Sequence, residues 1–253
     1  MQIIPIPCLQ DNYSYIINDV ISKNVGVIDP SEASPIIKFL EEKKLKLNYI
    51  FNTHHHFDHI GGNIELKKLY NAKVFGFCED NHRIPGIDIA LKDNEKFKFG
   101  TSTIKVMHIP GHTLGHICFF FEKEKIAFTG DTLFSLGCGK IFEGSHKQML
   151  LSLNKIKKLP LDTKIYCGHE YTYKNAQFCI KYDEKNSDLI KRFEEIKNLR
   201  SRNLPTIPTT LENELKSNIF LRCDQNDLKI KLNMKNQEDY KVFKKVRDLK
   251  DAF

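Results

Sequence analysis

The chain has 253 residues, of which 41% are hydrophobic, enough for one large domain or for a domain of usual size with a smaller one. The net charge is +7, but 33 lysines outnumber 6 arginines and lie among acidic residues, which is typical of a solvated surface rather than a nucleic-acid interface. The seven cysteines include no Cys-x-x-Cys pair, which argues against disulfides and thiolate-bound structural zinc and favours reduced thiols in the cytoplasm.

The first two thirds of the chain alternate short β-rich runs with helical ones. No run of 18 apolar residues occurs, so we expect no transmembrane helix, and the opening residues are typical of a strand rather than a signal peptide. In chain order we expect strands at 1–8, 12–18 and 25–28, a helix at 35–45, a strand at 49–52, a helix at 60–70, strands at 72–77, 104–109, 116–121 and 126–129, a helix at 145–158 with Ser145 as its N-cap, and a strand at 164–167.

The character of the sequence changes near residue 171. Polar helices are expected at 172–182 and 186–203, a segment with Pro205 and Pro208 breaks the pattern at 204–210, and a last helix is expected at 237–250. We therefore predict an α/β, strand-rich layered domain at 1–170 that carries the candidate site, followed by a smaller α-helical domain at 171–253.

The run Thr53-His54-His55-His56-Phe57-Asp58-His59 directly follows an apolar strand. In extended backbone alternate side chains share a face, so His54 and His56 are expected on one side and His55 on the other. A turn after Phe57, followed by Gly61-Gly62, would bring Asp58 and His59 back to the same region. Because ligand sites of α/β sheets form at strand ends, this run indicates a metal site.

Three further motifs place one ligand-type residue after an apolar strand and a glycine. They are Gly111-His112, Gly130-Asp131 and Gly168-His169. Glycine lets the backbone approach a shared centre closely. Each motif alone is more typical of a turn, but together they indicate one site.

Five histidines and two aspartates are then available as ligands, namely His54, His56, His59, His112, His169, Asp58 and Asp131. A single zinc ion takes three or four ligands. Seven ligands suit two ions about 3.5–4 Å apart that share a bridging carboxylate, as in known hydrolytic centres. Imidazole and carboxylate ligands suit zinc, iron or manganese.

These motifs resemble the metallo-β-lactamase superfamily, and within it the glyoxalase II (hydroxyacylglutathione hydrolase) family. The similarity includes Thr-His-His-His-x-Asp-His-x-Gly-Gly-Asn, Pro-Gly-His-Thr-x-Gly-His, Gly-Asp-Thr-Leu-Phe, Gly-Cys-Gly-Lys-x-Phe-Glu-Gly and Cys-Gly-His-Glu-Tyr-Thr. It extends to Asn218–Arg222 and the C-terminal residues 247–253. The resemblance implies an αββα sandwich, the metallo-β-lactamase fold, followed by a helical domain.

Position by position, the resemblance implies one metal held by His54, His56 and His112 and another held by Asp58, His59 and His169, with Asp131 bridging them. Two divalent ions are expected, zinc first and iron or manganese as alternatives. A water molecule bridging them would lose a proton near neutral pH and attack a thioester carbonyl. Asp58 would accept a hydrogen bond from that hydroxide, so Asp58 and Asp131 are the expected catalytic residues.

The resemblance also implies a small-molecule partner, a glutathione thioester such as S-D-lactoylglutathione, which would yield glutathione and D-lactate. The expected substrate-binding residues are Lys140, Phe142, Tyr171, Arg247 and Lys250. Phe142 stands where many members have tyrosine, so a hydroxyl contact would be lost, worth about 0.5–1.5 kcal/mol. We expect a cytoplasmic monomer without nucleic-acid or membrane partners.

Alternatives of other kinds share the expected fold. A glutathione persulfide dioxygenase would use fewer metal ligands, and an RNA-processing nuclease would suit the positive charge but normally has an additional basic arm. A non-enzymatic metal-binding module is disfavoured because all seven ligands are present. Asp29, at a strand end, is expected to orient a ligand, and Cys138 is expected to be a turn residue rather than a nucleophile.

Overall fold

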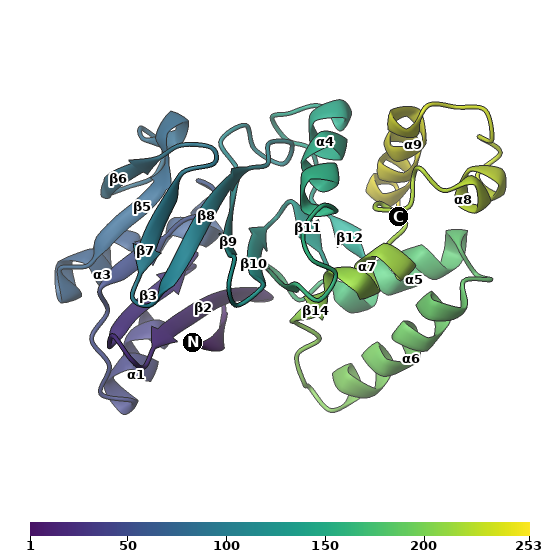
Figure 1. The fold of residues 1–253 in the computed structure, drawn as a ribbon. Helices are drawn as coiled ribbons and strands as arrows, with labels where there is room; N and C mark the ends of the chain where they lie inside the picture. Colours follow the sequence, from purple (N-terminus) through teal and green to yellow (C-terminus); the bar gives the residue numbers. More distant parts are fainter. The chain divides into compact units, whose positions relative to one another are not determined.

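The computed structural model describes residues 1–253, which form two compact units (Figure 1). The first unit comprises residues 1–108 and 115–130, and the second comprises residues 109–114 and 131–253. No helix combines the length and the apolar character that crossing a membrane requires. The domain boundary expected near residue 170 stays a prediction, because the two units are defined by packing and not by sequence similarity.

A six-stranded sheet forms one layer of the first unit, with its strands in chain order. The first three strands pair antiparallel, and the third to the sixth pair parallel. Parallel strands bring their carboxyl ends to the same edge. The strands are β1 (Gln2–Cys8), β2 (Asn12–Asp19), β3 (Asn24–Ile28), β4 (Tyr49–Phe51), β5 (Lys73–Phe77) and β6 (Ile87–Leu91).

Four antiparallel strands form the second layer of the first unit, in the order β10-β9-β8-β7. Aromatic side chains fill the space between the two layers, and the ring centroids of Phe51 and Phe119 lie 5.5 Å apart. All residues of β9 are buried, as expected for a central strand covered on both faces. The strands are β7 (Lys96–Phe99), β8 (Ser102–His108), β9 (Ile117–Phe121) and β10 (Ile126–Gly130).

The helices of the first unit are α1 (Ser34–Glu42), α2 (Phe57–Ile60) and α3 (Asn63–Tyr70), with a short 3₁₀ turn η1 (Cys78–Asp80). Buried side chains of α1 and α3 pack with those of the first sheet into an aliphatic core. The single helix expected at 60–70 was wrong, because the chain breaks at Gly61-Gly62. The Gly62 N–H donates to the carbonyl of Pro30 (2.8 Å), and a Cβ on Gly61 would collide with the carbonyl of Ser31.

The second unit contains a short hairpin, six helices and a two-stranded pair. The predicted N-cap of α4 is confirmed, because Ser145 and Gln148 form a capping box. The helices at 211–217 and 226–231 were not predicted from the sequence. In chain order the elements are β11 (Leu133–Phe134), β12 (Gly137–Cys138), α4 (His146–Ile156), β13 (Lys164–Cys167), α5 (Thr172–Tyr182), α6 (Ser187–Ser201), β14 (Thr209–Thr210), α7 (Leu211–Ser217), α8 (Asn226–Lys231) and α9 (Asp239–Asp251).

Candidate metal centre

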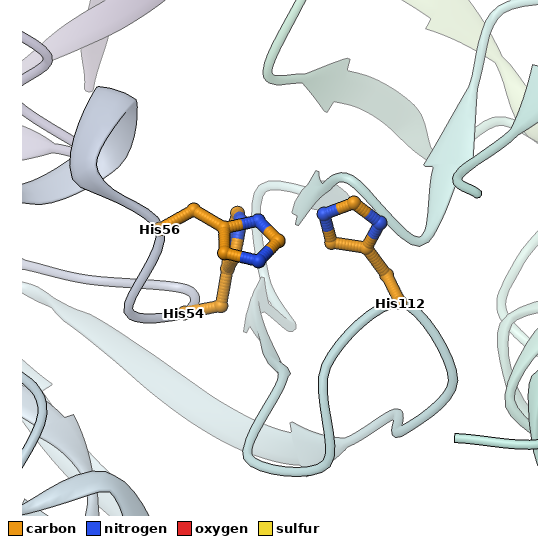
Figure 2. A group of neighbouring side chains, drawn as sticks. All are labelled: His54, His56 and His112. Carbon is orange, nitrogen blue, oxygen red and sulfur yellow. The ribbon is translucent and has the colours of Figure 1, made fainter. Parts of the chain in front are cut away.

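The histidine-rich run lies at the carboxyl end of β4, where the chain turns into α2. His54 and His56 lie together, with His54 Nε2 3.1 Å from His56 Nδ1, and their rings are drawn in Figure 2. His54 is fully buried, and His59, on α2, is 1% exposed. His54 and His56 therefore lie on the same side, as expected for alternate residues of an extended run.

Asp29 organises this half of the site from the end of the neighbouring strand β3. Its carboxylate accepts hydrogen bonds from the backbone N–H of Thr53 (2.7 Å) and from the Thr53 hydroxyl (2.7 Å), and it lies 3.1 Å from His59 Nδ1. The backbone of Asp29 has φ +47°, a strained value that tertiary contacts must hold. The orienting role expected for Asp29 agrees with these contacts.

These contacts decide which ring nitrogens carry protons. Because the Thr53 hydroxyl donates its one hydrogen to Asp29, the neighbouring His54 Nδ1 (3.0 Å) has to donate to the hydroxyl oxygen. His59 Nδ1 faces the Asp29 carboxylate and therefore also carries its proton. Nε2 of His54 and of His59 is then left with its lone pair, the form that binds a metal.

Asn12, at the start of β2, was not singled out by the sequence. Its side-chain amide donates to the carbonyl oxygen of Asp58 (3.1 Å) and to Asp58 Oδ2 (3.0 Å). The same Oδ2 lies 3.7 Å from His59 Nε2. Asparagine at a strand start is an ordinary turn residue, so only the contact with α2 reveals that Asn12 orients a ligand candidate.

His55 is directed away from this group, as predicted. Its Nδ1 lies 3.1 Å from Oδ2 of the fully buried Asp80, which is also paired with Arg83. Burial alone would raise the pKa of Asp80, but the hydrogen bonds from His55 and Arg83 hold that pKa below its ordinary value. This ion-paired cluster ties the histidine run to the segment after η1.

The second unit supplies the remaining ligand candidates. Asp131 Oδ2 lies 3.5 Å from His112 Nε2 and 3.3 Å from His169 Nε2. His112, whose ring is also drawn in Figure 2, faces the carbonyl oxygen of Lys140 through Nδ1 (2.7 Å), so Nδ1 is protonated and Nε2 keeps its lone pair. All three side chains are at most 6% exposed.

Glycines allow this close approach, as predicted for Gly111 and Gly130. Gly130 has φ +46°, and a Cβ there would lie 2.8 Å from the His116 ring. Gly111 has φ +152°, and a Cβ would lie 2.8 Å from the Cβ of Met149. A Cβ on Gly139 would meet the backbone of Asp131 and lie 3.0 Å from His112 Nδ1. A side chain at any of these positions would displace the strand ends that carry the ligand candidates.

The donor atoms within each unit fit a metal ion by distance and by chemistry. Two ligands on one tetrahedral zinc, each about 2.0–2.1 Å from it, lie roughly 3.3–3.4 Å apart. The donor separations within the two units run from 3.1 to 3.7 Å. In the first unit Asp29, His54 and His59 also form a group of metal-ligand type. We therefore find His and Asp side chains arranged as metal ligands in both units.

The expected substrate-binding residues all belong to the second unit. Phe142 is 60% exposed, its ring lies 5.2 Å from that of His112, and Lys140 Nζ lies 5.7 Å from the Phe142 ring. Tyr171 stacks on His169 at 4.6 Å. Arg247 is only 5% exposed, and Lys250 lies over the rings of Phe178 and Phe253, where burial lowers its pKa.

Cys138 is not activated as a nucleophile. The thiol is 4% exposed, and burial raises its pKa to about 11 despite the nearby Arg247. A nucleophilic cysteine needs a lowered pKa, so the expectation that Cys138 is not a nucleophile agrees with the structure. The expectation of a turn residue was wrong, because Cys138 pairs with Leu133 as part of strand β12.

The whole chain matches known proteins. Residues 10–169 match the metallo-beta-lactamase superfamily, and residues 170–253 match the hydroxyacylglutathione hydrolase C-terminus. The chain is 53% identical, over 100% of both chains, to the hydroxyacylglutathione hydrolase of Pelagibacter ubique strain HTCC1062. It is 42% identical to that of Methylococcus capsulatus, over 100% of this chain and 99% of the relative.

Solved structures share the fold at lower sequence identity. ETHE1 from Myxococcus xanthus superposes with a TM-score of 0.69 at 21% identity, covering 100% of this chain and 99% of that one. The BLEG-1 B3 metallo-beta-lactamase superposes with a TM-score of 0.67 at 24% identity, covering 87% and 99%. The chain thus has the metallo-β-lactamase α/β sandwich with a helical C-terminal region, and it belongs to the hydroxyacylglutathione hydrolase (glyoxalase II) family of the metallo-β-lactamase superfamily, a family of thioesterases.

Proposed function

We propose that the His and Asp ligand candidates form one binuclear metal centre, at which this chain hydrolyses S-D-lactoylglutathione and related 2-hydroxyacylglutathione thioesters. One ion would be held by His54, His56 and His112, the side chains drawn in Figure 2. The other would be held by Asp58, His59 and His169, with Asp131 bridging. We propose zinc as the metal. Iron and manganese are alternatives, because imidazole and carboxylate ligands suit all three metals.

One observation supports the bridging role most directly. A single oxygen of Asp131 lies 3.5 Å from Nε2 of His112 and 3.3 Å from Nε2 of His169. His112 and His169 are assigned to different ions. A carboxylate set between ligands of two ions is what a shared, charge-balancing bridge requires.

The metals, Asp58 and Asn12 have different roles in the proposed reaction. The chemistry that bound metals supply at such a centre is activation of a water molecule and polarisation of the thioester carbonyl. Asp58 accepts a hydrogen bond from the attacking water, and Asn12 holds one Asp58 oxygen so that the carboxylate keeps its direction. One proton of the water passes to Asp58 while the water oxygen bonds to the acyl carbon. The C–S bond then breaks, the sulfur leaves with the electron pair as glutathione thiolate, and the acid product gives its proton to solvent.

Substrate recognition is proposed to rest on the second unit. Glutathione carries two carboxylates, so the cations Lys140 and Lys250 suit its ends, and the phenol of Tyr171 suits its peptide groups. The ring of Phe142 beside His112 offers an apolar contact without a hydroxyl. The Arg247 guanidinium is engaged within the unit, where Nη1 donates to the carbonyl oxygen of Cys138 (2.7 Å).

The family membership favours the hydrolase over the alternatives of the same fold, because the match extends through the hydroxyacylglutathione hydrolase C-terminus. We propose a cytoplasmic location, which suits seven free thiols. All proposed ligands come from one chain, which supports a functional monomer. The mass of the purified active protein in solution would test that state.

Thiol release from S-D-lactoylglutathione by the purified chain, with bound metals counted, tests the proposal. We expect turnover with two metals bound. Asp58→Asn removes both a proposed metal ligand and the acceptor of the water proton, and it should lower kcat/KM by at least about 10²–10⁴-fold, the loss expected for a general base alone. Exposed Asp188→Asn is the matched control and should leave kcat/KM unchanged. Absence of turnover with two metals bound would contradict the thioesterase function.

A further inference from the structure

The hairpin of β11 and β12 lies in the chain between Asp131, a proposed metal ligand, and Lys140. It pairs Leu133 with Cys138 and Phe134 with Gly137, and every residue from Asp131 to Gly139 is buried. Buried turns have no water to satisfy their backbone groups, so those groups need partners from the protein.

The partners come from the C-terminal helices. All five carbonyl oxygens from Phe134 to Cys138 accept a hydrogen bond from a side chain there. The bonds are Asn218 Nδ2 to Phe134 (3.4 Å) and Gly137 (3.1 Å), Asn175 Nδ2 to Ser135 (3.1 Å), Cys179 Sγ to Leu136 (3.2 Å), and Arg247 Nη1 to Cys138 (2.7 Å).

The Asn218 side chain joins both strands of the hairpin. It is fully buried at the C-cap of α7, and its amide also donates to Glu214 Oε2 (3.0 Å). That carboxylate, itself fully buried, accepts from the N–H of Leu136 (2.7 Å) and the hydroxyl of Ser135 (3.1 Å). Asn218 therefore holds the hairpin through its carbonyl oxygens, and Glu214 holds it through a backbone N–H and a hydroxyl.

One end of the hairpin leads to a proposed ligand, Asp131, and the other leads to Lys140, whose carbonyl contacts the proposed ligand His112. Asp131 lies two residues before β11, and Lys140 lies two residues after β12. The Lys140 carbonyl accepts from His112 Nδ1 (2.7 Å) and so fixes the direction in which His112 Nε2 points. A shift of the hairpin would therefore move the bridging carboxylate and turn a histidine ligand together.

We propose that Asn218, supported by Glu214, is a positioning residue for the metal centre: it fixes the hairpin so that Asp131 and His112 present their donor atoms correctly. This inference rests on the proposed binuclear site. It gives a role to the Asn218–Arg222 motif and makes the helical region part of the metal-binding machinery as well as of substrate recognition. Arg247 takes part through Cys138, with its guanidinium 5.1 Å from the Phe220 ring.

The test compares metal binding by Asn218→Ala and Asn218→Asp with binding by the wild-type chain. Each metal-free protein is titrated with Zn²⁺ against a chromophoric chelator and, separately, with Co²⁺ while the d–d absorption is recorded. Loss of groups that orient metal ligands lowers affinity by about 10–100-fold, so we expect a loss in this range with an altered Co²⁺ spectrum. Aspartate keeps the shape of asparagine but cannot donate to the carbonyls.

Leu189→Ala is the matched control, because Leu189 is buried in α6 of the same unit. It should lower the Tm while leaving Zn²⁺ affinity and the Co²⁺ spectrum unchanged. If an Asn218 variant does not fold, Asn175→Ala removes only the bond to Ser135 and should weaken Zn²⁺ binding about two- to tenfold, as one neutral hydrogen bond is worth.

Two results would overturn the inference and can be told apart. If the Asn218 variants, or Asn175→Ala in their place, kept wild-type affinity and spectrum, the hairpin would not position the ligands, although the proposed function would stand. If the wild-type chain bound no metal, the proposed binuclear site would fall, and the inference with it.

Discussion

At the scale of single residues, the site depends on which nitrogen of each histidine carries the proton. His59 Nδ1 faces Asp29, and His112 Nδ1 faces the carbonyl of Lys140. Each contact assigns the proton to Nδ1 and leaves a lone pair on Nε2. The metal-ligand form of these side chains is therefore set by the protein before any ion binds, which lowers the reorganisation that binding requires.

Phe142 gives a prediction at this scale. It is exposed beside His112, where many family members are expected to have tyrosine. Phe142→Tyr should add a hydrogen bond to the substrate and lower KM for S-D-lactoylglutathione about two- to tenfold, since such a bond is worth about 0.5–1.5 kcal/mol. Steady-state kinetics should find kcat unchanged, because the hydroxyl contributes to binding and not to the reacting bond.

Phe193→Tyr, on α6, is the control for adding a phenol elsewhere in the second unit and should leave KM unchanged. A KM for Phe142→Tyr equal to that of the parent chain would show that residue 142 does not contact bound glutathione.

At the scale of elements, amphipathic or apolar runs predicted the longer helices and the buried strands. The strands β6 and β7 were missed, although both alternate apolar and polar residues. They are short, and β7 carries two lysines, features typical of strands at sheet edges, where burial is weak. Helices α7 and α8 have seven and six residues, too few for a readable 3.6-residue period.

Asp19 ties two turns of the first unit together and gives a pH-dependent prediction. Its carboxylate accepts from the N–H (2.6 Å) and hydroxyl (2.9 Å) of Thr101, from the Ser22 hydroxyl (2.9 Å) and from the Ile21 N–H (3.1 Å). The N–H of Thr101 and the other donors hold the pKa of Asp19 well below its ordinary value. The folded state thus favours the charged carboxylate.

The stabilisation by Asp19 is complete above the unfolded-state pKa of about 3.9 and is lost as the pH falls toward the lower folded-state pKa. Asp19→Asn should lower the free energy of unfolding by about 1–3 kcal/mol at pH 7. Urea unfolding should find this difference shrinking below about pH 4. As a control, Glu42→Gln at an exposed position should leave the free energy of unfolding at pH 7 unchanged. A loss of stability in Asp19→Asn that did not depend on pH would contradict the lowered pKa of Asp19.

At the scale of the whole molecule, metal binding is expected to contribute to the stability of the chain. A ligand that binds only the folded state stabilises it by about 2.7 kcal/mol when present at 100 times its Kd. Removal of the metals with a chelator should therefore abolish thioester hydrolysis and lower the Tm by about 5–10 °C for a chain of this size. Differential scanning calorimetry with parallel activity assays would measure both.

Zn²⁺ should restore activity and Tm together, whereas Mg²⁺ should restore neither, because it prefers oxygen ligands in octahedral geometry. Hydrolysis that survived complete metal removal would contradict a metal-dependent reaction. Parallel additions of Fe²⁺ and Mn²⁺ would establish which ions the site accepts.

The sequence by itself determined the ligand candidates, because side-chain chemistry and short spacings are local properties. His54, His56, Asp58 and His59 lie within six residues, and His112 follows a strand and a glycine. The strands before these two motifs belong to different sheets, β4 to the first and β8 to the second, so the rule that strand ends of one sheet gather at one edge does not by itself join the motifs.

Only the tertiary structure decided what holds those ligands in place. Asp29 is 30 residues from His59, Asn12 is 46 from Asp58, and Asn218 is 81 from Gly137. Asp29 was expected to orient a ligand because it lies at a strand end, but nothing local distinguishes the two asparagines from turn residues. A hydrogen bond depends on where its donor and acceptor meet in space, and the fold alone brings together partners so far apart in the chain.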